Sequence, residues 1–152
     1  MNEKTNLNLT VGGDHSIGSA TTHALLGAYP NLKVVWVDAH ADIIDYKRSN
    51  YPSYHGYPLS HILGINDGVL PGFKWMNRRL KPENVVLIGQ RSIDTDEIKT
   101  ITEYKIKCFT QDHIDELGIG EVMRRTINYL DPDGSFPFHI SFDIDALDPE
   151  LC

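Results

Sequence analysis

Aspartate and histidine side chains gather in three short stretches of the sequence. GGDHS occupies residues 12–16, DAHAD residues 38–42 and SFDIDALDP residues 141–149. Together they offer four carboxylates and two imidazoles without a thiolate: His15, Asp38, His40, Asp42, Asp143 and Asp145. Oxygen-rich ligation with some imidazole favours manganese, and less exclusively iron, cobalt or nickel, over the sulfur-rich sites of structural zinc. Because six donors exceed what one catalytic ion needs, they indicate a pair of ions bridged by carboxylates.

The middle stretch explains why these donors would converge. Residues 34–43, VVWVDAHADI, run from apolar strand-forming residues directly into Asp38, His40 and Asp42. Side chains two positions apart on an extended chain point to the same side. Carboxylates crowded at the end of a buried strand are costly unless a positive charge lies among them, and this stretch contains no lysine or arginine. A divalent cation would supply the charge.

Strands and helices that alternate along the chain would position these donors. The sequence predicts strands at residues 6–11, 33–37, 84–88, 107–109 and 138–142. It predicts helices at residues 16–29, 59–63, 95–104 and 120–130, with Asp94 as the cap of the third, and a solvated helix face at residues 74–81. The alternation indicates a three-layer α/β/α fold with a mostly parallel sheet. Sites in such sheets lie beyond the carboxyl ends of the strands, where each Asp/His cluster falls.

Composition restricts the class of protein. The chain has 152 residues, 41% of them hydrophobic and 23% charged, which is typical of one soluble globular domain. A formal net charge of −7 argues against general affinity for nucleic acid or anionic membranes. Two cysteines give no disulfide framework, and the opening MNEKTNLNL lacks the features of a signal peptide. We therefore expect a reducing, cytoplasmic setting.

In their order along the chain, the three stretches resemble the signature motifs of the arginase and agmatinase family, the ureohydrolases. The resemblance implies two Mn²⁺ ions, one held by His15, Asp38, Asp42 and Asp143 and the other by Asp38, His40, Asp143 and Asp145. Asp38 and Asp143 would be the bridging carboxylates. It also implies that residues 1–152 form the central part of a single arginase-like catalytic domain, with N- and C-terminal segments missing.

The activity implied by the resemblance is hydrolysis of a guanidino compound, with L-arginine converted to L-ornithine and urea as the expected case. A guanidinium carbon is a poor electrophile and water a poor nucleophile, whereas a bound divalent ion can lower the pKa of water toward roughly 7. Asp42 would orient the attacking hydroxide and relay its proton to the leaving amine. His55, followed by Gly56 at the family's spacing after DAHAD, would be the proton shuttle.

A second segment resembles a substrate-binding part of the family. LIGQRSID, residues 87–94, is similar to the segment whose last carboxylate binds the substrate α-amino group. Asp94 would make that contact, supported by Glu97. A role for Asp94 as a plain helix cap is compatible with the same sequence, and both roles can hold together.

One part of the pattern departs from that of arginases. The positions that bind the substrate α-carboxylate in arginases correspond here to Ile44, Tyr51 and Ser53, of which only Ser53 is a polar replacement of comparable size. Ser49 and Asn50 could serve instead if the loop bends differently. Agmatine or another guanidino compound is therefore an alternative substrate.

Other interpretations stay open at this point. The altered loop and the missing segments are also compatible with a non-catalytic, metal-binding protein or fragment. A dinucleotide-binding domain is disfavoured because no GxGxxG pattern follows Gly12 and Gly13. The resemblance implies a homo-oligomer, a trimer or hexamer, and it leaves a mitochondrial location open beside the cytoplasmic one.

Overall fold

Four parallel strands form the centre of the structure, a computed structural model that describes residues 7–48, 52–68, 71–148 and 150. They are β1 (Lys33–Val37), β2 (Val85–Gln90), β3 (Lys107–Thr110) and β4 (Phe138–Phe142). Their order across the sheet is β3-β2-β1-β4, and every neighbouring pair is parallel. The strands predicted at residues 33–37, 84–88, 107–109 and 138–142 are thereby confirmed.

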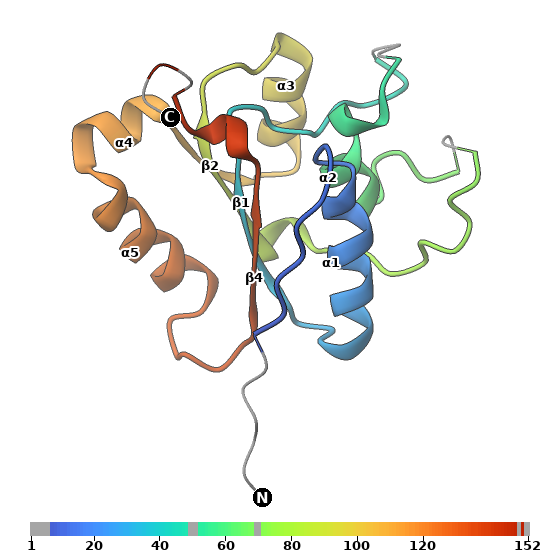
Figure 1. The fold of residues 1–152 in the computed structure, drawn as a ribbon, viewed down its shortest axis with the longest axis horizontal. Helices are drawn as coiled ribbons and strands as arrows, with labels where there is room; N and C mark the ends of the chain where they lie inside the picture. The colour runs from blue at the N-terminus through green and yellow to red at the C-terminus, as the bar shows by residue number, and fades with distance from the viewer. Residues whose placement is uncertain (1–6, 49–51, 69–70, 149, 151–152) are drawn as a thin grey trace, which may run out of the picture.

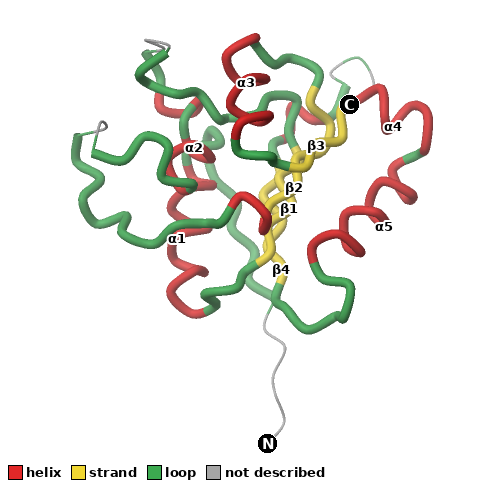
Figure 2. Tube along the Cα trace, turned by 180° about the vertical axis from the view of Figure 1, so that it is seen from behind, coloured by secondary structure: helices red, strands yellow, loops and turns green. Residues whose placement is uncertain are grey.

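Helices cover both faces of this sheet. In Figures 1 and 2, α1 (Ile17–Ala28) and α2 (Pro58–Ile62) lie on one side of the strands, and α4 (Gln111–Leu117) and α5 (Ile119–Leu130) on the other. The helix α3 (Thr95–Glu103) follows β2. Short 3₁₀ turns occur at Tyr54–Gly56, Pro82–Asn84 and Ile144–Ala146. The arrangement confirms the predicted three-layer α/β/α fold.

Alternate residues of β1 serve two separate cores. Val34 and Trp36 pack in the cluster on the α1 and α2 side of the sheet, whereas Val35 packs in the cluster that contains Val122 and Leu130 of α5. Because successive side chains of a strand point to opposite faces, a strand buried on both faces needs a continuous apolar run. The sequence KVVWV meets that requirement and fixes β1 in the middle of the molecule.

The sequence-based prediction of a strand at residues 6–11 is wrong for residues 7–11, which have no regular secondary structure, and Asn6 lies outside the described residues. Leu7 is 95% exposed, and Leu9 and Val11 are also exposed. A strand needs a partner for its backbone groups, and none of the strand pairings in the described parts of the chain includes this segment.

One predicted helix is absent, and one observed helix was not predicted. Residues 74–81 form no helix, because their backbone bonds elsewhere: Leu80 N–H donates to the Ile62 carbonyl at 2.9 Å, and the Met76 and Leu80 side chains are buried in the core. The helix that was not predicted is α4. The sequence at the start of α4 does carry a local signal for a helix, because Thr110 and His113 form a capping box.

None of the helices formed by the described residues is both long enough and apolar enough to cross a bilayer.

Candidate metal centre

Two neighbouring strands and one helix start bring the predicted metal ligands together. β1 and β4 are in register, with Val37 beside Phe142, so Asp38 and Asp143 leave the sheet side by side. A hydrogen bond of 2.9 Å from Asp143 N to the Val37 carbonyl extends this pairing past the last residue of β4. His15 reaches the same place from the turn before α1. Parallel strands that end at one edge thus deliver their carboxylates to one point, as predicted.

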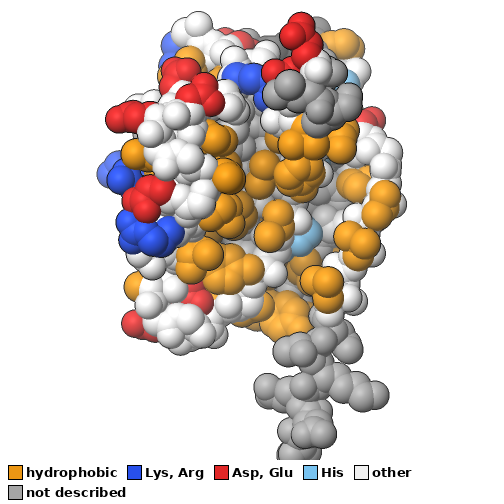
Figure 3. Space-filling model, turned by 60° about the vertical axis from the view of Figure 1, so that its left-hand side comes forward, with side chains coloured by type: hydrophobic (Ala, Val, Ile, Leu, Met, Phe, Trp, Pro, Cys, Tyr) orange, Lys and Arg blue, Asp and Glu red, His pale blue; other side chains and the backbone are white. Residues whose placement is uncertain are grey.

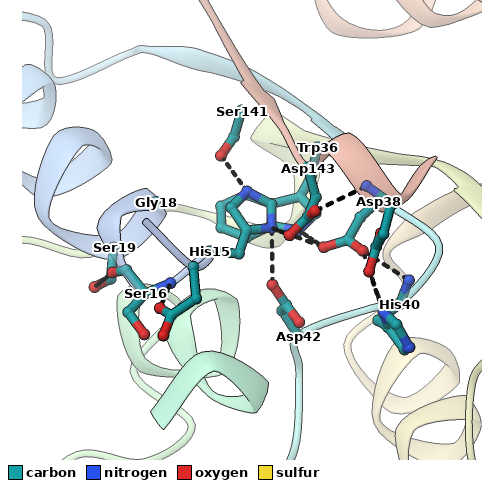
Figure 4. Close-up of polar contacts among 12 residues, drawn as sticks. His15, Ser16, Gly18, Ser19, Trp36, Asp38, His40, Asp42, Ser141 and Asp143 are labelled. Atoms are coloured by element: carbon teal, nitrogen blue, oxygen red, sulfur yellow. Dashed lines mark hydrogen bonds and ion pairs between the residues drawn. The ribbon is translucent and has the colours of Figure 1, made fainter. Parts of the chain in front are cut away.

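Three carboxylates surround one nitrogen of His15. Its Nδ1 lies 2.7 Å from Asp38 Oδ2, 2.9 Å from Asp42 Oδ2 and 3.5 Å from Asp143 Oδ2 (Figure 4). His15, Asp38 and Asp42 are buried, and Asp143 is half-buried. One oxygen each of Asp38, Asp42 and Asp143 therefore lies within 3.5 Å of the same nitrogen atom.

A second group of donors lies beside the first and shares Asp38 with it. His40 Nδ1 lies 3.0 Å from Asp145 Oδ2 and 3.6 Å from Asp38 Oδ1. Asp145 Oδ1 also accepts a hydrogen bond of 3.2 Å from Ala39 N–H, which ties the third motif to the second. Within the described residues, His15, Asp38 and Asp143 form one set able to hold an ion, and Asp38, His40 and Asp145 form another.

Two residues that were not singled out from the sequence, Ser141 and Trp36, contact the His15 ring. Ser141 Oγ lies 2.8 Å from His15 Nε2, and the Trp36 ring stacks on the imidazole with centroids 4.1 Å apart (Figure 4). The Trp36 indole N–H donates to Asp38 Oδ2 at 3.3 Å. Ser141 and Trp36 each lie two positions before a predicted ligand on the same strand face, and this period of two was the only signal in the sequence.

The crowding of charges shifts the pKa of His15, Asp42 and Asp38. Burial by itself would lower the pKa of His15, but the hydrogen bond to Asp38 and the close carboxylate of Asp42 outweigh it and raise the pKa to about 9. Burial, with the negative charge of Asp38 adding to it against the opposing effect of His15, raises the pKa of Asp42 to about 7. Burial also opposes ionisation of Asp38, but hydrogen bonds from His15 and from His40 N–H hold its pKa below the ordinary value.

The donor set fits divalent cations. Asp42 Oδ2 is buried and has no partner in hydrogen-bond geometry, although it lies close to His15. Such a carboxylate oxygen is costly to bury, and its raised pKa expresses that cost. A positive ion among these oxygens would remove the cost, and the mixture of carboxylates and imidazoles suits Mn²⁺-like ions. Which ion each residue would hold stays a prediction from the sequence.

A cavity of about 760 Å³ opens onto these donors, and it contains most of the other predicted site residues. His55 and Gly56 of the Tyr54–Gly56 turn line it, as do Ile44, Asp94 and Glu97. Ser53 precedes that turn and is not among the lining residues, so its predicted substrate contact gains no support. Ser49, Asn50 and Tyr51 lie outside the described residues.

Asp94 and Glu97 are bound to each other as a capping box at the start of α3. Asp94 Oδ1 accepts hydrogen bonds of 2.8 Å from Asp96 N–H and from Glu97 N–H. Glu97 Oε2 accepts one of 3.2 Å from Asp94 N–H. The predicted cap is confirmed. Because Asp94 also lines the cavity, the cap and a substrate contact are compatible in space.

Arg91 is a further residue at the cavity that the sequence analysis left unassigned. Its guanidinium donates to the backbone carbonyls of Asp145, Ala146 and Leu147. The Ile144–Ala146 turn that carries Asp145 is thereby tied to the end of β2.

Carboxylate and imidazole donors at the carboxyl ends of parallel strands, above an open cavity, form a candidate metal centre of the kind that hydrolytic α/β enzymes use. Comparison with known proteins identifies one family within this class of enzymes. The sequence profile of the Arginase family matches residues 1–152, and the chain belongs to that family of metal-dependent hydrolases.

Individual relatives agree with this assignment. The chain is 43% identical over 152 residues to an arginase of Glaciozyma antarctica and 42% identical over 146 residues to mitochondrial arginase-2 of Mus musculus. These alignments cover 97% and 94% of this chain but 44% and 41% of the relatives. The crystal structure of the cold-adapted arginase from Glaciozyma antarctica superposes with a TM-score of 0.84 at 45% identity, over 91% of this chain and 50% of that one. The chain thus spans about half the length of the relatives it matches.

Proposed function

We propose that this protein takes part in manganese-dependent hydrolysis of a guanidino compound, with L-arginine converted to L-ornithine and urea as the first reaction to test. The observation that carries the proposal is the convergence of His15, Asp38, Asp42 and Asp143 beside the neighbouring group of Asp38, His40 and Asp145. Membership of the Arginase family supports the same reaction class.

Two Mn²⁺ ions would be held by these two groups, with Asp38 common to both and Asp143 as the second shared carboxylate. When bound, the ions lower the pKa of water so that hydroxide is available near neutral pH. The carboxylates that surround His15 would be among the residues that hold these cations.

The residues of the chain would carry the remaining steps. Asp42 accepts the proton of the attacking water and passes it to the amine nitrogen as the bond between that nitrogen and the guanidinium carbon breaks. His55, on the cavity wall, exchanges protons between this site and solvent. Asp94 uses Oδ1 for the cap of α3, and its Oδ2 is the oxygen that we assign to the substrate amine.

One observation supports a second candidate substrate. Ile44 turns an apolar side chain to the cavity, and its backbone groups are already engaged: its N–H donates to Gly56 O at 3.1 Å, and its carbonyl accepts from Asn66 Nδ2 at 2.8 Å. This part of the cavity wall therefore offers no free hydrogen-bond donor from Ile44 to a substrate α-carboxylate. Agmatine, which lacks that group, is the alternative to L-arginine.

Urea release tests the proposal. The protein is loaded with Mn²⁺, its metal content is measured, and urea formation is followed with L-arginine and with agmatine. We expect turnover of at least one of them, and a loss of turnover without loss of metal in His55→Ala. A protein that binds two ions but releases urea from no guanidino compound would support the second interpretation, a metal-binding protein without this activity.

Assembly and location follow from the resemblance alone and are part of the same proposal. We propose a homo-oligomer, a trimer or hexamer, in the cytoplasm. Sedimentation of the purified protein tests the first statement and cell fractionation the second.

A further inference from the structure

The backbone at Asp42 has an unusual conformation for a residue with a side chain. Its φ is 52°, in the left-handed region, where the Cβ of an L-residue is crowded by the backbone. Aspartate tolerates this region better than most residues, but the conformation persists only where surrounding contacts hold it. What holds Asp42 therefore also determines where its carboxylate points.

Both polar groups of the peptide unit between Asp42 and Ile43 are held by other elements. The Asp42 carbonyl accepts hydrogen bonds from Leu59 N–H at 3.0 Å and from Ser60 N–H at 3.2 Å, both in α2. The Ile43 N–H donates to Glu97 Oε1 at 3.3 Å. With its oxygen fixed on one side and its N–H on the other, this peptide plane cannot rotate without breaking bonds to two different helices.

Glu97 is suited to this task by its burial and its partners. The residue is 7% exposed, and each of its carboxylate oxygens accepts a backbone N–H: Oε1 that of Ile43 and Oε2 that of Asp94. Bonds from backbone N–H groups to a carboxylate are charge-assisted and hence stronger than neutral ones. The side chain links the loop after the second motif to the start of α3.

We infer that Glu97 is a positioning residue, which fixes the Asp42–Ile43 peptide plane and thereby directs the Asp42 carboxylate toward His15 and the metal centre. This role differs from the substrate contact that the sequence implies for Glu97. A residue that contacts substrate affects KM most, whereas a residue that directs a ligand affects the metal centre and kcat. The inference rests on the proposed metal centre.

The variant Glu97→Gln tests it with little change in size. An amide offers one acceptor oxygen where the carboxylate offers two, so one of the two backbone N–H groups loses its partner. The protein is titrated with Co²⁺, a spectroscopic substitute for Mn²⁺, and the visible absorption of the loaded form reports the ligand geometry. We expect Co²⁺ affinity to fall by about 10-fold to 100-fold, the range typical of residues that orient metal ligands, with a changed spectrum. In the assay of urea release, kcat should fall while KM stays unchanged.

Asp96→Asn is the matched control. Asp96 lies in the same first turn of α3, and its carboxylate pairs with Lys99 at 2.8 Å on the surface. The change also converts a carboxylate to an amide near the start of the helix, so it reproduces any general loss of helix-dipole stabilisation. We expect its Co²⁺ affinity and spectrum to match those of the unmodified protein. Glu97→Asp, which keeps the charge but shortens the reach, should behave like Glu97→Gln.

Every other result of these experiments counts against the inference. Unchanged Co²⁺ affinity and spectrum in Glu97→Gln would overturn the inference, and a rise in KM alone would return Glu97 to a direct substrate contact. If Glu97→Gln and Glu97→Asp both lose their helical circular dichroism, Glu97 is needed for the fold as a whole and the inference is likewise overturned. If the unmodified protein binds no Co²⁺ or Mn²⁺, the proposed function fails together with it, whereas normal binding in all variants removes the inference alone.

Discussion

Asp38 is the residue that both groups of donors share, so its removal tests the metal centre most directly. Its two oxygens lie 2.7 Å from His15 Nδ1 and 3.6 Å from His40 Nδ1. We expect Asp38→Ala, and likewise Asp143→Ala, to lose the two-ion state, because a missing bridge weakens both sites. Metal analysis after dialysis against Mn²⁺ measures this. His55→Ala is the control and should keep both ions; equal metal content in all three variants would contradict the assignment.

The pKa of His15 predicts a pH dependence of metal binding. With a pKa raised to about 9, the imidazole of the metal-free protein is protonated at pH 7 and must lose that proton to bind an ion. The apparent affinity for Mn²⁺ should therefore rise about tenfold per pH unit between pH 7 and 8.5 and level off above the pKa. Below pH 7 the slope should be steeper, because Asp42, with a pKa raised to about 7, then carries a second proton.

Calorimetry measures this release of protons. Titrations at pH 8 in two buffers with different enthalpies of ionisation should show about one proton released for the ion that binds at His15. An affinity that stays constant from pH 7 to 8.5 would mean that His15 is not a ligand in solution.

At the scale of single residues, the sequence predicted which side chains come together at the site. It did not predict the hydrogen bonds that orient them. Spacing by two along a strand was sufficient to place Asp38 and Asp143 at one edge of the sheet. It could not show that Glu97 bonds to the backbone after Asp42, because that contact depends on how α3 packs. Contacts between elements distant in the sequence require the fold, not the local pattern.

Among the elements, α1 approaches the sheet closely because of one glycine. A Cβ at Gly18 would lie 2.5 Å from Trp36 Cη2 and 3.1 Å from Ser141 Oγ. Both residues hold His15. We therefore expect Gly18→Ala to destabilise the protein by about 1 to 3 kcal/mol, the usual effect of an overpacked core, and to weaken metal binding. Guanidinium unfolding and Co²⁺ titration measure the two effects.

Gly120 provides the matched control in α5, where a Cβ would meet nothing within 4 Å. Gly120→Ala should not destabilise the protein, because alanine has the better helix propensity and the added Cβ meets no atom. Similar effects of the two substitutions would show that Gly18 is not a close-contact position.

The elements with apolar patterns were predicted well, and those that depend on partners were not. The runs at β1 and β2 are buried on both faces, which any continuous apolar strand pattern indicates. Leu7, Leu9 and Val11 alternate as in a strand, but they are exposed and belong to none of the strand pairings of the described residues. The polar sequence of α4 shows too little apolar periodicity to be recognised, and only its cap is informative.

At the scale of the whole molecule, β4 is unusual because it exposes large apolar side chains. Ile140 is 59% exposed, and Phe138, Phe142 and Ile144 are also exposed large apolar residues. Figure 3 shows a broad apolar area on the side of the molecule that it brings forward. Large apolar patches and open strand edges favour association.

A charged residue on this strand should reduce that tendency. We expect Ile140→Lys to bind less of a hydrophobic dye and to scatter less light at high concentration, with Co²⁺ binding unchanged. Ile98→Lys is the control, since Ile98 is 50% exposed but lies on α3 rather than at the sheet edge. If both substitutions act equally, the effect comes from net charge and not from β4.

The stacking of Trp36 on His15 gives the protein an internal optical reporter. The chain has two tryptophans; Trp36 is fully buried against the metal centre, and Trp75 is half exposed on a loop. A protonated imidazole in contact with an indole quenches its emission. Loading the site with a non-quenching ion such as Zn²⁺ expels that proton, so the buried component of the fluorescence should brighten as the ion enters.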